Sequence, residues 1–352
     1  MRPSFAARLG LALAVPLLVT GCPSSTPRVV LYSAQDQEFA AGLLDDFKQR
    51  TGLAVAPKYD TEANKSVSLY VELVNEKDRP RCDVFWNNEI LSTIRLQRQG
   101  LLDPYDSPAA KPYPASAKAA DHTWHAFAAR PRILIVNTKL VPEAQRPRGL
   151  LDLTDARWRN RVVMALPQYG TSATQAACLF EVLGTEKARD YYRGLKANGV
   201  QIAPGNKQVA EWVGRGRTPR GQPAAVGVTD PDDALAEVRA GNDVAIILPD
   251  RDAQADGRMG TLFIPNTLMI LKGCPNPAGA RRLVDYLLSP EVEAKLAESE
   301  SHQVPLNPEV KAKLPKELQG ARTARGMQVD FGRAADLWDE SQKFVIAEFG
   351  GP

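Results

Sequence analysis

The sequence predicts an α/β protein of two lobes, each a mostly parallel sheet flanked by helices. Short apolar runs of strand length alternate with amphipathic stretches of helix length through most of the chain. Two longer extended segments, 131–137 and 261–271, interrupt this alternation and are typical of crossings between lobes. With 352 residues, the chain is long enough for two domains that each have a core.

The first hundred residues predict three strand–helix pairs. Residues 29–33 form an apolar run typical of a buried parallel strand. The stretch 36–50 has apolar residues at helical spacing, and Gly52 stands where a helix C-cap is expected. The other expected elements are strands at 53–59 and 83–86 and helices at 65–76 and 89–98.

The same alternation returns after the first crossing. It predicts strands at 161–165 and 224–228, and helices at 174–183, 188–198 and 232–240. Helices at 277–288 and 290–298 follow the second crossing, and Pro290 suits a first helical turn. The tail, 329–349, is expected to form a final helical segment that packs back on the fold.

Composition narrows the class of protein. A hydrophobic content of 44% and a charged content of 24% are ordinary for a soluble globular protein, and no basic tract favours nucleic acid as a partner. Cys82, Cys178 and Cys274 lack the CxxC spacing of zinc or redox sites, so we expect small buried apolar side chains. A monomer is expected.

The first 22 residues predict export. Arg2 and Arg8 precede an apolar run too short to span a bilayer, which is typical of a secretory leader. The residues before Cys22 resemble a bacterial lipobox, which implies a signal peptide over 1–21, a lipid on Cys22 and a tether over 22–27. The protein would then be anchored in the cell envelope, facing the periplasm or the cell exterior. The alternative is an ordinary signal peptide with an incidental cysteine.

Five motifs in series carry a resemblance to a known family. They are VVLYSAQDQE at 29–38, DVFW at 83–86, GLLDPY at 100–105, WRNRV at 158–162 and AGARRLVDYLLSPE at 278–291. Their order and spacing resemble the extracellular solute-binding proteins of ABC importers, in the ferric-iron-binding branch. The resemblance implies the two-lobed type II periplasmic-binding-protein fold, with a ligand held between lobes that close by hinge motion. The lobes would comprise 28–132 with 265–315 and 133–264 with 316–352.

The resemblance also implies where a metal would bind. In the relatives, a histidine, a glutamate, two adjacent tyrosines and an anion hold the ion. Asp36 stands at the place of the histidine, and Asn88 stands at that of the glutamate, with Glu89 beside it. The tyrosine pair is missing, and the matching turn at 226–233 instead ends in acids.

A set of carboxylates at strand ends therefore remains as the candidate metal site. It consists of Asp36, Glu89, Asp230, Asp232 and Asp233. Hard oxygen ligands suit ferric iron, calcium, magnesium or manganese, and the family favours iron. The alternative for Asp36, Asp232 and Asp233 is that each caps a helix start without any ligand.

A candidate anion site lies on the other wall. Gly170, Thr171 and Ser172 precede a predicted helix, whose free N–H groups favour a negative group. The relatives use this loop and an asparagine that matches Asn206. A plain Ser/Thr helix cap is the alternative. Arg130 and Arg132 flank the first crossing, and each could meet a carboxylate or phosphate or pair with a surface acid.

The predicted function is a substrate-binding lipoprotein that captures a metal ion, with iron favoured, and delivers it to an ABC permease and its ATPase. No catalytic cofactor is expected. A small organic ligand, a polyamine or aminophosphonate, is the alternative within this class. A secreted hydrolase is the alternative from another class, but neither HExxH nor GxSxG occurs. His122 and His125 could ligate zinc, although solvated surface histidines are the simpler interpretation.

Overall fold

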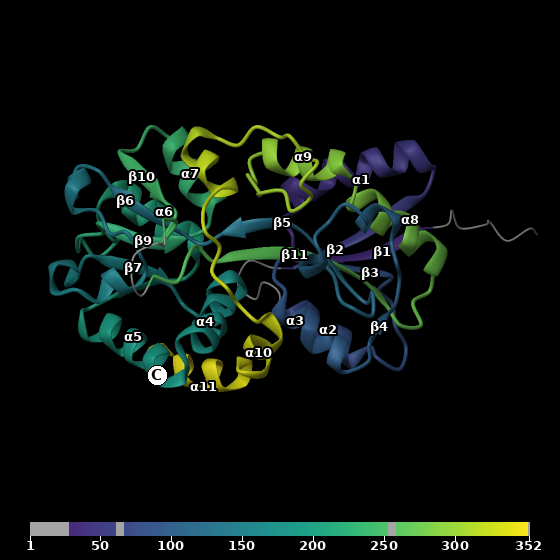
Figure 1. The fold of residues 1–352 in the computed structure, drawn as a ribbon, viewed down its shortest axis with the longest axis horizontal. Helices are drawn as coiled ribbons and strands as arrows, with labels where there is room; N and C mark the ends of the chain where they lie inside the picture. The colour runs from purple at the N-terminus through teal and green to yellow at the C-terminus, as the bar shows by residue number, and fades with distance from the viewer. Residues whose placement is uncertain (1–27, 61–66, 253–257, 351–352) are drawn as a thin grey trace, which may run out of the picture.

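The computed structural model describes residues 28–60, 67–252 and 258–350, which form two α/β lobes (Figure 1). The first lobe is built on a sheet in the order β2-β1-β3-β11-β4, with β5 also paired to β11. Its strands are β1 (Arg28–Ser33), β2 (Ala54–Tyr59), β3 (Val84–Asn87), β4 (Leu102–Asp103), β5 (His125–Pro131) and β11 (Phe263–Leu271). β1 runs parallel to β2 and β3, whereas β11 is antiparallel to its neighbours.

The helices of the first lobe cover this sheet. They are α1 (Gln37–Thr51), α2 (Val67–Asn75), α3 (Leu91–Arg98), α8 (Pro277–Leu287) and α9 (Pro290–Glu298). The apolar face of α1 is buried, and the helix ends at Gly52, whose φ of 69° is costly for any residue with a Cβ. Ser289 caps α9 by accepting from the Val292 N–H, directly before Pro290 in the first turn.

The second lobe has a sheet of its own in the order β10-β6-β9-β7-β8. The strands are β6 (Ile133–Asn137), β7 (Val162–Ala165), β8 (Gln201–Ala203), β9 (Val226–Thr229) and β10 (Val244–Ile247). Its helices are α4 (Gly170–Leu183), α5 (Thr185–Ala197), α6 (Asn206–Arg215) and α7 (Pro231–Arg239). β7 is parallel to β8 and β9, and β6 is antiparallel to β9 and β10.

The chain passes between the lobes where the sequence predicts the first crossing. β5 belongs to the first sheet and ends at Pro131, and β6 belongs to the second and begins at Ile133, so Arg132 lies between them. The return crossing comes earlier than expected. Phe263–Leu271 already forms β11 of the first sheet, because its residues pair with β5 and β3.

The tail forms two helices, α10 (Phe331–Asp336) and α11 (Trp338–Phe349), that run along both lobes (Figure 1). On the side of the first lobe, Arg98 of α3 pairs with Asp336, and Arg95 lies 3.3 Å from Asp339. On the other side, Arg189 of α5 lies 2.8 Å from Glu340. The final helices therefore connect α3 with α4 and α5.

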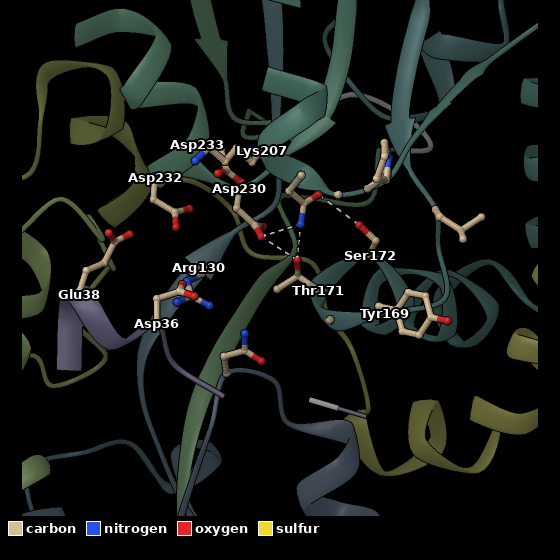
Figure 2. Close-up of a pocket in the computed structure, with 17 residues that line it drawn as sticks. Asp36, Glu38, Arg130, Tyr169, Thr171, Ser172, Lys207, Asp230, Asp232 and Asp233 are labelled. Carbon is tan, nitrogen blue, oxygen red and sulfur yellow. Dashed lines mark hydrogen bonds between the residues drawn. The ribbon is translucent and has the colours of Figure 1, made fainter. Parts of the chain in front are cut away.

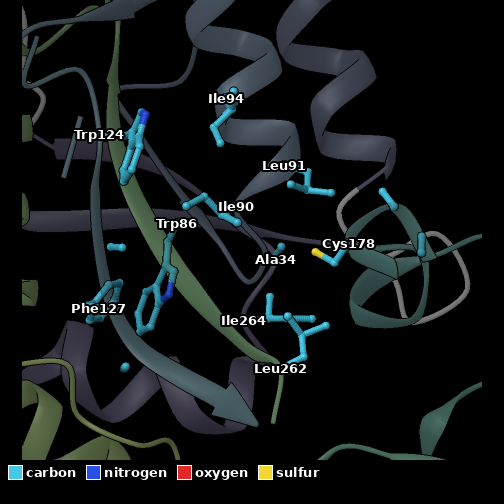
Figure 3. Packing of buried hydrophobic residues seen from close by; sticks show 14 of the residues in the cluster. Ala34, Trp86, Ile90, Leu91, Ile94, Trp124, Phe127, Cys178, Leu262 and Ile264 are labelled. Carbon is cyan, nitrogen blue, oxygen red and sulfur yellow. The ribbon is translucent and has the colours of Figure 1, made fainter. Parts of the chain in front are cut away.

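A continuous apolar core extends across the contact between the lobes (Figure 3). Cys178 of α4 lies there near Leu91 of α3 and near Ile264 of β11. Cys82, Cys178 and Cys274 are all buried and free, as the sequence predicts. A second core covers the other face of the second sheet.

Several boundaries differ from the prediction. α4 begins at Gly170, four residues before the expected start, so the predicted anion loop is the first turn of the helix itself. The sequence did not predict α6, β8 or β10. The leader, Cys22 and the tether lie outside the described residues. Within the described ranges, none of the helices combines the length and apolar character needed to span a membrane.

Candidate functional site

A pocket of about 320 Å³ lies between the lobes, where five strands end (Figure 2). Asp36 follows β1 and Asn88 follows β3, both from the first lobe. On the second lobe, lining residues follow β7, β8 and β9. Ligands of open α/β sheets bind beyond the carboxyl ends of the strands, so this position is the expected one for a solute.

Four helices begin at this pocket and fall into two classes. α1 and α7 carry acids at or near their starts: Asp36 and Glu38 on α1, and Asp232 and Asp233 on α7. α4 and α6 have no acid in the first turn, and their starts bring Gly170, Thr171, Ser172, Asn206 and Lys207 to the pocket. Acids in the first turn thus offset the partial positive charge at the starts of α1 and α7, whereas the starts of α4 and α6 carry polar side chains, two of which donate to Asp230.

The structure brings together most residues that the sequence selects. The pocket is lined by Asp36, Asn88, Gly170, Thr171, Ser172, Asn206, Asp230, Asp232 and Asp233. Glu38 of α1 and Asp232 of α7 both line the pocket, one from each lobe (Figure 2). Carboxylates from both lobes therefore face the same space.

Glu89 does not reach this pocket. Its side chain is fully buried, and its carboxylate accepts hydrogen bonds from the N–H groups of Leu91 (2.7 Å) and Ser92 (3.0 Å) at the start of α3. Thr174 of α4 donates a further bond of 3.1 Å. Glu89 caps one helix and connects it to the other lobe, so the structure does not place it where a shared metal site requires it.

Asp230 lines the pocket but is already paired with a cation. Its Oδ1 lies 2.5 Å from Nη1 of Arg132, and its Oδ2 accepts from Thr171 (2.7 Å) and Asn206 (3.0 Å). Arg132 is only 2% exposed and also donates to Gln175 and Ser172. Arg132 thus pairs with a buried acid rather than with a surface one.

The pKa of Asp230 reflects this pairing. Burial raises the pKa, but the Arg132 and Arg130 guanidinium groups and the hydrogen bonds from Thr171 and Arg132 outweigh burial and hold it below the ordinary value. Asp230 is therefore ionised at neutral pH and neutralised by Arg132. A metal that used this carboxylate would have to compete with the guanidinium.

The expected five-carboxylate metal site is consequently incomplete. Among the described residues, no group of three or more His, Cys, Asp or Glu side chains is placed to hold a metal ion. Four of the five predicted acids line the pocket, and one of these four, Asp230, is bound to Arg132; Glu38 also lines the pocket. A metal bound here would need donors from a second molecule, such as an oxyanion.

The predicted hydroxyl groups of the anion site are also engaged. Thr171 donates to Asp230, and Ser172 donates to Oδ1 of Asn206 at 3.2 Å. The groups left to bind an anion are the first-turn N–H groups of α4 and α6, which have no partner within their own helices.

Sequence reasoning did not select two charged residues of the pocket, Glu38 and Lys207. Glu38 lies in the first turn of α1, and Lys207 lies in the first turn of α6. Lys207 was not selected because the sequence analysis did not predict α6. For Arg130, the sequence leaves open whether it meets an anion or pairs with a surface acid. It lines the pocket and is 3% exposed.

The histidines lie elsewhere. Nε2 of His125 is 2.8 Å from the Tyr105 carbonyl, and burial lowers the pKa of His125, which favours the neutral ring. His122 lies 3.5 Å from Asp106. Neither lines the pocket, so the histidine pair does not contribute to this site.

Comparison with known proteins decides the class. Residues 92–323 match the family described as bacterial extracellular solute-binding proteins. This chain belongs to that family. Its members are solute-binding components of transport systems rather than enzymes, which excludes the hydrolase alternative.

Individual relatives of this solute-binding protein differ in what their names say they bind. The major ferric iron-binding protein of Neisseria meningitidis is 26% identical over 53% of this chain and 56% of its own length. The match therefore spans little more than half of that relative. A putative 2-aminoethylphosphonate-binding periplasmic protein of Salmonella paratyphi A is 25% identical over 82% of both chains.

Solved structures confirm the two-lobed fold of this solute-binding protein. Iron-bound HitA from Pseudomonas aeruginosa superposes with a TM-score of 0.77 at 21% identity, covering 91% of this chain and 99% of HitA. At that level of identity, the likeness establishes the fold alone.

Proposed function

We propose that the protein is the solute-binding component of an ABC importer and captures its cargo in the pocket between the lobes. One observation carries the proposal: helix starts with acids and helix starts without acids meet at one pocket. Such a pocket suits a cargo that presents a positive centre and a negative group side by side.

Ferric iron bound together with a small oxyanion is the first candidate cargo. Asp36, Asp232 and Asp233 would offer oxygen ligands, and the oxyanion would supply further donors to the metal while resting on α4 and α6. The name of the Neisseria protein supports iron. The missing tyrosine pair makes the oxyanion essential in this proposal.

An aminophosphonate is the second candidate. Its ammonium group would face the same acids and its phosphonate the same helix starts, so a single zwitterion would satisfy both sides. Two observations favour it: the described residues do not form a complete metal site, and the Salmonella relative aligns over most of both chains.

Metal analysis and native mass spectrometry of protein purified without chelators test the proposal. Stoichiometric iron with an accompanying anion supports the first cargo, and titration with 2-aminoethylphosphonate tests the second. A purified protein that binds neither ferric citrate nor 2-aminoethylphosphonate would contradict the proposed function.

We also propose a location and a division into lobes. A lipid on Cys22 would anchor the protein in the cell envelope beside its permease and ATPase, and labelling with radioactive fatty acid should be lost in Cys22→Ala. The units that close on the cargo would be 28–132 with 265–315 and 133–264 with 316–352, except that Phe263 and Ile264 belong to β11 of the first lobe.

A further inference from the structure

The strand that leads into the first crossing, β5, contains a buried residue in an unusual conformation. Ala128 has a φ of 43°, in the left-handed region that is unfavourable for any residue with a Cβ, and its side chain is fully buried. In the ladder with β11, Ala129 and Phe127 are paired with consecutive residues, so Ala128 has no partner in the register. Ala128 is therefore the extra residue of a β-bulge, four positions before Arg132.

Two buried side chains bind the backbone of the bulged residue. Oε1 of Glu293 accepts a hydrogen bond from the Ala128 N–H at 2.7 Å, and the Asn266 amide donates to the Ala128 carbonyl. The Trp86 indole N–H donates to Oδ1 of Asn266 at 3.2 Å, which leaves the amide nitrogen to face Ala128. Both backbone groups of Ala128 are thus satisfied, and the surroundings maintain its left-handed conformation.

Glu293 joins two of the connections between the lobes. Besides the Ala128 N–H, its carboxylate accepts from the N–H groups of Leu306 and Asn307, each at 2.9 Å. The chain is there leaving the first lobe for a second time, because Leu314 already belongs to the second core. A fully buried carboxylate of α9 therefore holds β5 and residues 306–307 together where both connections begin.

We infer that Glu293 is a positioning residue for lobe closure, because it maintains the Ala128 bulge and thereby sets the direction in which β5 leaves the first lobe. A bulge bends its strand and increases the local twist, and one extra residue changes the face to which the following side chains point. Without the bulge, the lobes would meet at a different angle, and the donors that each lobe brings to the pocket would no longer face the same space. This inference rests on the proposed function, since it assumes that closure of the lobes captures the cargo.

Glu293→Ala tests the inference in two measurements. Small-angle X-ray scattering of the empty protein should give a radius of gyration that differs from the wild-type value. Calorimetric titration with ferric citrate or 2-aminoethylphosphonate, whichever the wild type binds, should show an affinity about tenfold lower or less, because both lobes line the pocket. Glu293→Gln keeps an acceptor for the Ala128 N–H and should change both measurements less.

Asp83→Ala is the matched control. Asp83 is another fully buried acid of the first lobe, and its carboxylate also accepts from backbone N–H groups, those of Val30 (2.7 Å) and Asn276 (2.6 Å). It lies away from β5, so its loss should lower thermal stability without changing the radius of gyration or the affinity.

The double variant Glu293→Ala with Ala128→Gly separates the bulge from a general loss of stability. Glycine adopts a left-handed φ without a steric cost, so the double variant should recover the wild-type radius of gyration and most of the affinity. A double variant as altered as Glu293→Ala would overturn the inference, because the effect would not pass through the conformation of Ala128.

Two glycine variants keep the test valid if Glu293→Ala does not fold. Ala126 is buried in the same strand and paired regularly with Thr267, so Ala126→Gly should lower the urea midpoint, as glycine does within a strand. Ala128→Gly should lower the midpoint less, or raise it, because glycine relieves the left-handed strain. Equal losses in the two variants would show that Ala128 is not strained and would overturn the inference.

The outcomes separate this inference from the proposed function. A Glu293→Ala protein that scatters and binds cargo as the wild type does would overturn the role of Glu293 and leave solute capture intact. If the wild type binds neither ligand, the proposed function fails, whereas scattering by the empty variants still decides whether Glu293 sets the arrangement of the lobes.

Discussion

The helix starts around the pocket form two pairs, α1 with α7 and α4 with α6, that expose the same backbone groups in opposite electrostatic settings. In the first pair, Asp36 and Glu38, and Asp232 and Asp233, already place negative charge on the helix starts. In the second pair the first turns contain no acid. The difference teaches that an acid in the first turn and a bound anion would satisfy the same backbone N–H groups, so the acids of α1 and α7 disfavour an anion beside those two helices.

The largest expected effect on stability comes from replacing Arg132. Its guanidinium pairs with Asp230, which lies between the two pairs of helix starts. Arg132→Met should lower the free energy of unfolding by about 3–5 kcal/mol, because it leaves a buried carboxylate without its partner. Urea denaturation measures the change. Arg132→Met combined with Asp230→Leu should recover much of the loss, and a double variant as unstable as the single one would show that the pair is not the cause.

Glu89 tests whether an acid near a helix start serves the fold or the cargo. Glu89→Ala should lower the free energy of unfolding by about 1–2 kcal/mol, since the start of α3 loses its cap. The affinity for ferric iron with an oxyanion should stay at the wild-type value, because Glu89 lies outside the pocket. A large loss of affinity in a folded variant would show that Glu89 contributes to cargo binding.

The acids of α7 give the opposite expectation. Asp232→Asn with Asp233→Asn should change the free energy of unfolding by less than about 1 kcal/mol, whereas the affinity for the cationic part of the cargo should fall about tenfold. Phosphate alone should bind more tightly, since two negative charges have left the pocket. Calorimetry of both ligands checks the pair of changes, and equal shifts in the same direction would break the comparison.

A pH series gives the smallest and sharpest effect. The pKa of Asp230 lies below its ordinary value in the folded protein, so its contribution to stability is complete above about pH 4 and is lost as the pH falls through the lower, folded pKa. Asp230→Asn should flatten this acid part of the stability profile. Chemical denaturation between pH 2 and 6, spanning roughly that window, measures it, and identical profiles would show that Asp230 is not responsible.

Local signals predicted most of the fold. Gly52 and Pro290 mark a helix end and a helix start in the sequence, and the structure has both there. Most of the pocket residues could be selected because they directly follow predicted strands. The carboxyl ends of parallel strands lie at the same edge of a sheet.

The remaining features depend on partners distant in the sequence. Asp230 and Arg132 are separated by 98 positions, and only the fold shows that one neutralises the other. Asn88 and Glu89 are adjacent, yet the first lines the pocket and the second is buried in a cap. Side chains of neighbouring residues face different directions at a strand end, and sequence alone does not fix which one faces the ligand.

The buried cysteines make the protein a convenient one to label. Cys82, Cys178 and Cys274 are buried, and burial raises the pKa of each thiol, so the reactive thiolate is scarce at neutral pH. A cysteine introduced at an exposed position on each lobe should therefore react with a fluorophore before these three do. Energy transfer between two such dyes would then show whether the lobes approach one another when cargo is added, without removing a native thiol from the described part of the chain.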